Sequence, residues 1–338
     1  MSPASYFAMA VAIGFAFMLG VSDAPNASAS LIASRCASYR SSMAFSFAAH
    51  VCGGLIAGQA VAATMSSLEH VSNRQLPGTY IAGGLVSLGF TLIATRKAIP
   101  VSASIGLVGG LAGAAIASGG WHSVGWGGMH GVRPYGVLGT LLAIGISPIV
   151  GGLVAAGLRR FLGRTLRKAG RETLRPVRVA IWITAGLVGL ADGSNDGQKA
   201  MGLMTALLVA AHSIPSFAVP FWTRLVVAVV LALGTASGGR KIIQTVSSRF
   251  YRGGPLDGLA AQGAAAVSIL GSAWLGAPVS TSTVVASGMI GVGASRRYRH
   301  VHWPTVRTVV SAWVITLPVC AVLGAGAVEI FKMIGVFQ

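Results

Sequence analysis

The chain has 338 residues, of which 54% are hydrophobic and only 9% are charged. Soluble domains carry about 25% charged residues, so these charges are too few to cover a soluble protein of this length. The composition therefore predicts a polytopic helical membrane protein. It also excludes nucleic acid as the reason for the formal net charge of +18, because the cytoplasmic loops of membrane proteins retain basic residues.

Ten apolar stretches along the chain approach or exceed the roughly 20 residues that cross a hydrocarbon core as a helix. Each is predicted to be helical, because open strands would leave backbone groups unpaired in lipid. Their ranges are 5–33, 43–64, 79–95, 98–118, 136–158, 178–208, 219–236, 257–275, 278–294 and 306–334. The first stretch resembles a signal peptide, but no Lys or Arg precedes Arg35, so we expect it to be a membrane span.

The basic residues between these stretches predict the topology. Segment 159–178 holds eight of them, so we place it in the cytoplasm. If the chain crosses the membrane once at each stretch, 20 of the 25 Lys and Arg residues lie on the cytoplasmic side. We therefore expect a multi-pass protein of the cell (plasma) membrane, with ten crossings and both termini outside.

Two motifs occur twice, in the same order. Segment 20–27 (GVSDAPNA) aligns with 193–200 (GSNDGQKA), and 100–104 (PVSAS) aligns with 278–282 (PVSTS). Five spans in each copy would invert the second copy relative to the first, as in many secondary transporters. We predict an all-α fold of two inverted-topology repeats with broken or re-entrant helices and about 10–12 membrane segments. The predicted parts are repeat 1 (1–158), a basic cytoplasmic linker (159–177) and repeat 2 (178–338).

The first motif carries acidic residues into apolar spans. A charge at the bilayer centre costs at least ~2.5 kcal/mol on insertion scales, so such a residue suggests function. Pro25 and Gly197 weaken the helices around the motif aspartates, and unwound carbonyls with carboxylate and amide oxygens would suit Na⁺ or a proton. The predicted cation-coupling residues, with Ser22 the weakest, are Ser22, Asp23, Asn26, Asn195 and Asp196. The Na⁺ ligands among them, if sodium is the coupling ion, would be Asp23, Asn26, Asn195 and Asp196.

The second motif has the chemistry of an anion site. A proline at a helix start pre-sets the first turn, and the free N–H groups and positive dipole end attract anions. The hydroxyls that follow Pro100 and Pro278 would suit a tetrahedral oxyanion. Serine and threonine also simply help helices pack in lipid, but the duplication favours the anion site.

A cation cage beside an anion site predicts a secondary active transporter that carries an oxyanion with a cation, with its site between the repeats. The chain would not be an enzyme, and it would need no cofactor beyond the coupling ion. One alternative is a passive anion channel, because half-helices can line a pore. An intramembrane aspartyl protease would need both carboxylates at one site, and it would leave the second motif unexplained.

At these motifs the chain resembles the inorganic phosphate transporter (Pit) family. The resemblance lies in segments 20–26, 193–202, 100–104 and 278–283. It implies import of inorganic phosphate with Na⁺ or H⁺ by alternating access, with a sulfate permease of the same fold as the alternative. It also implies that phosphate contacts Ser102, Ser104, Gln198, Ser280, Thr281 and Ser282. Ser22 and Pro25 depart from the family pattern, and the long hydrophilic central domain of some relatives is absent.

The sequence does not decide the roles of several polar residues within or near the spans. Asp192 aligns with Leu19, so it either supports the site or packs. Lys199 either pairs with a nearby aspartate or contacts the anion. His50 and His212 are expected to be packing residues more than proton relays, and three scattered cysteines form no metal motif. We expect the lipid bilayer and phosphate as partners, no nucleic acid, and a homodimer as one option.

Overall fold

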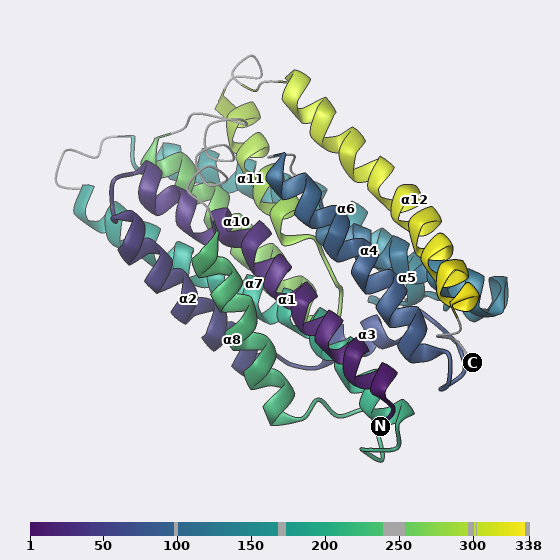
Figure 1. Ribbon diagram of the computed structural model, residues 1–338. Helices are drawn as coiled ribbons and strands as arrows, with labels where there is room; N and C mark the ends of the chain where they lie inside the picture. The colour runs from purple at the N-terminus through teal and green to yellow at the C-terminus, as the bar shows by residue number, and fades with distance from the viewer. Residues whose placement is uncertain (98–100, 168–173, 239–253, 297–300, 302, 335–338) are drawn as a thin grey trace.

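Figure 1 shows the computed structural model, which describes residues 1–97, 101–167, 174–238, 254–296, 301 and 303–334. The described chain is almost entirely helical, as its composition predicts. The helices are α1 (Pro3–Ala33), α2 (Tyr39–Ile56), α3 (Ala60–Ser66), α4 (Leu76–Arg96), α5 (Ala103–Gly119), α6 (Gly136–Thr165), α7 (Leu174–Ala210), α8 (Phe221–Ser237), α10 (Pro255–Trp274), α11 (Thr281–Arg296) and α12 (Trp303–Met333). Pro100 and residues 168–173 of the predicted basic linker lie outside the described residues.

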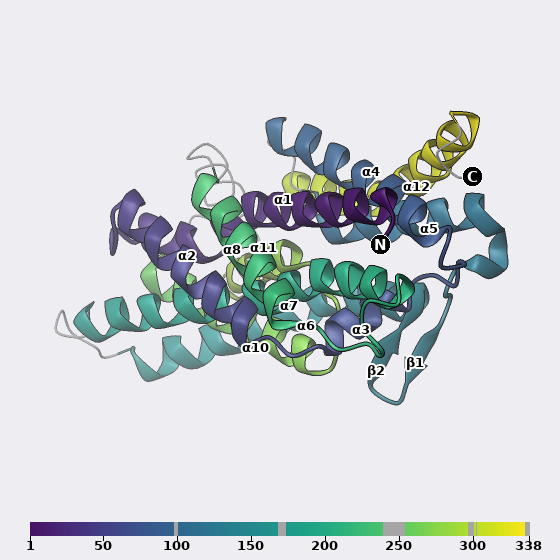
Figure 2. The same ribbon diagram turned by 60° about the horizontal axis from the view of Figure 1, so that its bottom comes forward.

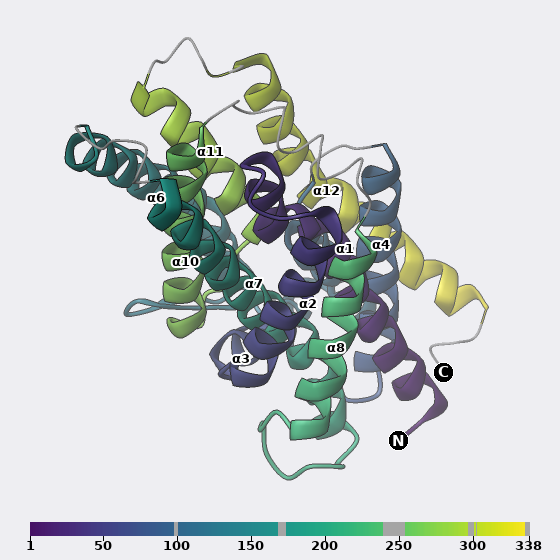
Figure 3. The same ribbon diagram turned by 90° about the vertical axis from the view of Figure 1, so that its left-hand side faces the viewer.

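The helices of the two halves pack on each other in reciprocal pairs. α1 packs against α8 and α2 packs against α7, while α5 packs against α12 and α11 packs against α6. Within the halves, α4 packs against α5 and α10 packs against α11. Each contact has its counterpart when α1, α2, α4, α5 and α6 are matched with α7, α8, α10, α11 and α12. The halves are therefore interlocked, and Figure 3 shows α1, α2 and α8 side by side.

Glycines allow the closest of these crossings. A Cβ on Gly20 of α1 would lie 1.9 Å from the Leu231 carbonyl oxygen of α8, and one on Gly193 of α7 would lie 2.3 Å from the His50 oxygen of α2. Gly20 and Gly193 occupy the same position in the two copies of the first motif. The motif glycines thus let backbones meet at equivalent crossings in both halves.

Five described helices are long and apolar enough to cross a membrane, and a sixth span results if α2 and α3 are counted as one. These two form a broken helix, because they meet at a bend of 75°. α5 has 17 residues and α11 has 16, so at 1.5 Å per residue each is about 25 Å long. They are shorter than the roughly 30 Å hydrocarbon core, and we call them half-helices because their first residues, Ala103 and Thr281, are buried inside the molecule.

The motif helices differ from the expectation that they unwind. α1 continues through Pro25 to Ala33, and α7 continues through Gly197 to Ala210. The Gln262 side chain of α10 donates to the carbonyl oxygens of Asn26 and Ala27 at 3.2 Å, close after the proline. Pro25 itself has no N–H to donate to the Val21 carbonyl oxygen four residues earlier, so the Gln262 hydrogen bonds hold the turn after the proline and do not replace the missing bond.

The two ends of the molecule differ in charge. The start of α1 and the end of α12 lie at the same end (Figure 1). The opposite end carries the C-terminal turns of α4 and α6, where Arg96, Lys97, Arg160 and Arg164 are exposed. This arrangement agrees with the predicted clustering of basic residues on one side.

A short hairpin covers part of the end that holds the termini (Figure 2). Strands β1 (Gly128–His130) and β2 (Arg133–Tyr135) pair antiparallel, after a 3₁₀ turn at Trp121–Ser123. The connection between α3 and α4 joins this region through a bridge from Glu69 to Val124, so that Glu69 becomes buried.

Glu69 gives the chain a pH-dependent stability. Burial raises the pKa of Glu69 from 4.5 to about 8, against a smaller lowering effect of the Tyr80 hydroxyl. At pH values between 4.5 and about 8, the Glu69 carboxyl group is deprotonated in the unfolded chain but still protonated in the folded chain. Stability should therefore fall as the pH rises from about 4.5 to about 8, by up to ~1.4 kcal/mol per pH unit. Thermal midpoints of Glu69→Gln in detergent should lose this slope, whereas the exposed control Glu329→Gln should keep it; equal slopes would contradict the assignment.

A buried ion cluster joins three helices at the basic end. Asp257, at the start of α10, is 1% exposed and accepts hydrogen bonds from Arg159 of α6 and, at 3.0 Å, from Arg296 of α11. Removing one partner of a buried pair leaves the other charge uncompensated.

Asp257→Asn is expected to cost about 3 kcal/mol of folding free energy. This value is at the lower end of the range for breaking a buried ion pair, because both arginine side chains are partly exposed to water. Arg296→Gln should cost under about 1 kcal/mol, because that side chain is 48% exposed. Thermal midpoints of the purified variants measure both. If both variants kept the thermal midpoint of the unmodified chain, the ion cluster would not stabilise the fold.

Candidate functional site

The first motif places two carboxylates around one amide. Asn26 of α1 donates from Nδ2 to Asp23 Oδ1 at 3.2 Å and to Asp192 Oδ2 of α7 at 3.1 Å. All three side chains are buried. Asp192 thus joins the first copy of the motif from the second half of the chain. Its other oxygen, Oδ1, is buried without a hydrogen-bond partner among the described residues.

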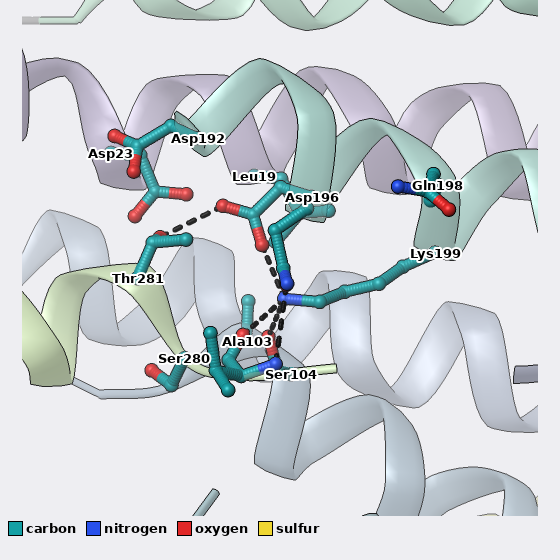
Figure 4. Close-up of polar contacts among 12 residues, drawn as sticks. Leu19, Asp23, Ala103, Ser104, Asp192, Asp196, Gln198, Lys199, Ser280 and Thr281 are labelled. Carbon is teal, nitrogen blue, oxygen red and sulfur yellow. Dashed lines mark hydrogen bonds and ion pairs between the residues drawn. The ribbon is translucent and has the colours of Figure 1, made fainter. Parts of the chain in front are cut away.

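The second copy of the motif holds an ion pair. Asp196 and Lys199, one turn apart on α7, form a buried pair (Figure 4). Lys199 Nζ also donates to Ser104 Oγ of α5 at 2.7 Å and to the Val279 carbonyl oxygen. Thr281 of α11 donates from Oγ1 to Asp196 Oδ2 at 2.8 Å. The pair therefore links the starts of both half-helices.

These contacts bring the two predicted sites together. Asp196 comes from the predicted cation site, whereas Ser104 and Thr281 come from the predicted anion site. Asp23 and Asp192 lie next to the same group (Figure 4). The sequence motifs, more than 70 residues apart within each half, thus form one buried polar cluster between the halves.

The starts of the half-helices are built by serines. Ser102 caps α5 and accepts a hydrogen bond from the Ile105 N–H at 3.2 Å. The Ser280 carbonyl oxygen accepts the first backbone hydrogen bonds of α11. Pro278 precedes Thr281 by three residues, so it does not occupy the first turn as the sequence suggested. It lies in the extended approach to the helix, where its fixed φ is also accommodated.

Asn195 positions this approach segment. Its Nδ2 donates to the Ala277 carbonyl oxygen at 3.0 Å, and its Oδ1 accepts from the Val279 N–H at 3.2 Å. Both polar ends of the amide are thus used on the backbone before α11. The contacts of Asn195 are therefore those of a residue that holds the half-helix in place.

Besides Ser102 and Asn195, four of the expected residues have no side-chain hydrogen bond to the cluster within the described chain. Ser22 donates to the Leu19 carbonyl oxygen of its own helix. Gln198 accepts from the Val61 N–H at the start of α3 and donates to Ser194, so it points away from Lys199 (Figure 4). Ser280 is buried and Ser282 half-buried, with no hydroxyl hydrogen bond to the residues above.

Three residues enter the cluster that the sequence left open or set aside. Asp192 and Lys199 are described above. His50 of α2 is fully buried, donates from Nδ1 to the Ser46 carbonyl oxygen at 2.7 Å, and has Nε2 at 3.9 Å from Asp192 Oδ2. Asp192 could be recognised only from its place one turn before Asp196, which put it on the same helix face.

This arrangement defines a class of protein. Interlocked repeats that bring half-helix starts and buried carboxylates together away from both ends are the architecture of secondary membrane transporters. Among the described residues, no group of three His, Cys, Asp or Glu side chains could hold a metal ion.

Comparison with known proteins gives the family. The model of the phosphate transporter family matches residues 19–175 and again 163–324. A probable low-affinity inorganic phosphate transporter of Rhizobium meliloti is 32% identical over 319 residues, covering 94% of this chain and 93% of its own length. One of Bacillus subtilis is 31% identical, with 96% of both chains covered. The chain therefore belongs to the phosphate transporter family, and its relatives are transporters and not enzymes.

A solved structure confirms the fold. "The sodium-dependent phosphate transporter" superposes with a TM-score of 0.82 over 98% of this chain and 100% of that one, at 19% identity. The double match of the family model agrees with the duplicated motifs. An all-α membrane protein of two inverted repeats is thus confirmed.

Proposed function

We propose that the chain imports inorganic phosphate by symport with Na⁺ or H⁺, by alternating access at the buried cluster between the repeats. The observation that carries this proposal is the convergence of α5 and α11 on the Asp196–Lys199 pair, beside Asp23 and Asp192. The names of the relatives support phosphate as the substrate.

The starts of the half-helices would bind the anion. Ser102 and Ser280 begin helices whose first N–H groups lack partners within the helix, and Ser104 and Thr281 add hydroxyl groups. Lys199 supplies a positive charge within hydrogen-bonding distance of Ser104. Gln198 would reach phosphate only after α3 moves away from it, because both ends of its amide are engaged.

The carboxylates would bind the coupling ion. Asp23, Asn26 and Asp192 offer oxygen ligands that suit Na⁺, or a carboxylate that takes a proton. A bound cation would offset the charge of the anion in a medium of low dielectric constant. Asn195 would act through the backbone before α11. Ser22 would contribute only after its hydroxyl turns from Leu19.

Alternating access fits the burial of the cluster. Asp196 is 1% exposed and Lys199 is fully buried, which is what a closed state of the site would require. A cavity of about 770 Å³ opens at the end of the termini and is lined by residues such as Ser5, Asn73, Arg74 and His212. We place this end outside the plasma membrane, because the basic residues gather at the other end.

Phosphate is favoured over sulfate by hydrogen-bond chemistry. Monohydrogen phosphate carries a proton that a carboxylate such as Asp196 can accept as a hydrogen bond, whereas fully ionised sulfate cannot donate one. A sulfate permease would be expected to lack this need for acceptors near the half-helices.

Counterflow into proteoliposomes tests this proposal. Vesicles loaded with unlabelled phosphate should take up labelled phosphate transiently above equilibrium, because a carrier exchanges its substrates across a closed state. Excess external sulfate should leave the overshoot unchanged. No overshoot despite phosphate permeation would identify a channel, and loss of the signal to sulfate would identify a sulfate permease.

A further inference from the structure

The two copies of the first motif differ in charge at one position. Asp23 and Asp196 are equivalent, and three residues later the first copy has Asn26 where the second copy has Lys199. The same side of the helix therefore presents a neutral amide in one half and an ammonium in the other. The repeats are symmetric in fold but unequal in charge.

Lys199 is completely satisfied inside the cluster. An ammonium has three N–H donors, and Lys199 Nζ has three acceptors: an Asp196 oxygen, Ser104 Oγ and the Val279 carbonyl oxygen. The side chain is 0% exposed. The charge of Asp196 is thus neutralised within the protein, and its second oxygen already accepts from Thr281.

The first copy has no such charge of its own, and the ammonium of Lys199 pairs directly only with Asp196 and acts on Asp23 and Asp192 from farther away. Asp23 and Asp192 share the single amide of Asn26, and no ammonium or guanidinium contacts either carboxylate among the described residues. Asp192 Oδ1 is buried without a partner, and Figure 4 shows its carboxylate beside that of Asp23. Two carboxylates in a buried site need a compensating cation.

We propose that Lys199 is the resident cation of the second repeat, so that the coupling cation binds in only one repeat, between Asp23 and Asp192. This inference rests on the proposed cation symport and adds its ion count. The ammonium occupies, at Asp196, the place that Na⁺ or a proton would take at Asp23. The pseudo-symmetric second cation site is thereby filled by the protein itself.

Converting the second copy into the first tests the proposal. Lys199→Asn should open a second cation site at Asp196. The purified full chain is reconstituted in proteoliposomes, and the number of cations moved with each phosphate is obtained from the reversal potential under Na⁺ gradients and, separately, under H⁺ gradients. The variant should move one cation more per phosphate than the unmodified chain. A variant that transports with an unchanged number would overturn the proposal.

A second variant and a control separate this effect from damage. Asp196→Asn combined with Lys199→Asn removes both charges and should return the cation number to that of the unmodified chain. Lys97→Asn makes the same substitution at an exposed site at the end of α4 and should change nothing.

If Lys199→Asn does not transport, cation binding to the purified variant tests the proposal instead. The thermal midpoint in detergent should rise with Na⁺ concentration, or with acidity if the ion is a proton, more steeply for Lys199→Asn than for the unmodified chain or the double variant. Equal dependence in all three would overturn the proposal. Failure of the unmodified chain to couple phosphate to either gradient would instead reject the proposed function.

Discussion

Asp23→Asn is expected to lower phosphate uptake at least about 100-fold while leaving the protein as stable as before, or more stable. A 100-fold loss corresponds to about 2.7 kcal/mol. Asp23 is buried, has no cationic partner in the described part of the chain, and shares the Asn26 amide with Asp192. Neutralising it removes a coupling ligand and, in the same step, the repulsion between two buried carboxylates.

The measurement is initial uptake of labelled phosphate into proteoliposomes, together with the thermal midpoint in detergent. Glu329→Gln is the control, because it neutralises a carboxylate that is 60% exposed. That variant should keep its uptake. If Asp23→Asn transports at the rate of the unmodified chain, Asp23 does not serve the coupling ion. If uptake and midpoint fall together, its role is structural.

Gly20→Ala is expected to destabilise the chain by about 3 kcal/mol or more, although alanine is the better helix former by about 0.5–1 kcal/mol. The new Cβ would lie 1.9 Å from the Leu231 carbonyl oxygen, which belongs to the backbone of α8 and cannot turn aside. α1 and α8 would have to separate at a crossing on which the position of Asp23 depends.

Gly89→Ala is the matched control on α4, because nothing lies within 4 Å of a Cβ at that position. Its thermal midpoint should stay the same or rise. Gly193→Ala should behave like Gly20→Ala, since its Cβ would meet the His50 backbone at 2.3 Å. Unchanged midpoints for both motif glycines would contradict the close crossings.

The sequence predicts much of this fold because lipid restricts the options. Apolar stretches must be helices there, and ten predicted stretches each contain helix in the structure. The duplicated motifs predict the inverted repeats. The bend between α2 and α3 is different, because segment 43–64 is mostly apolar and has no proline, and its break is marked only by Gly58 and Gln59. That bend depends on contacts with distant helices.

The site was predictable in composition more than in geometry. Repetition identifies Asp23, Asp196, Ser104 and Thr281 as members of functional motifs. It cannot show that Asp196 and Thr281, 85 residues apart, share a hydrogen bond. Repetition also fails to identify Lys199, because this residue differs from Asn26, its equivalent in the first copy, and its proposed role depends on that difference in charge. Pro25 does not interrupt α1, although a proline removes one backbone hydrogen bond, because a long helix packed against its neighbours tolerates that loss.

The most direct test of cation-coupled phosphate transport is accumulation against the phosphate gradient. Proteoliposomes containing the unmodified chain receive equal phosphate on both sides and an inward gradient of Na⁺ or of H⁺. We expect one of these gradients to drive internal labelled phosphate several-fold above the external concentration, and an ionophore for that ion to abolish the excess. Equilibration to equal concentrations under both gradients, by correctly inserted protein, would contradict coupled transport.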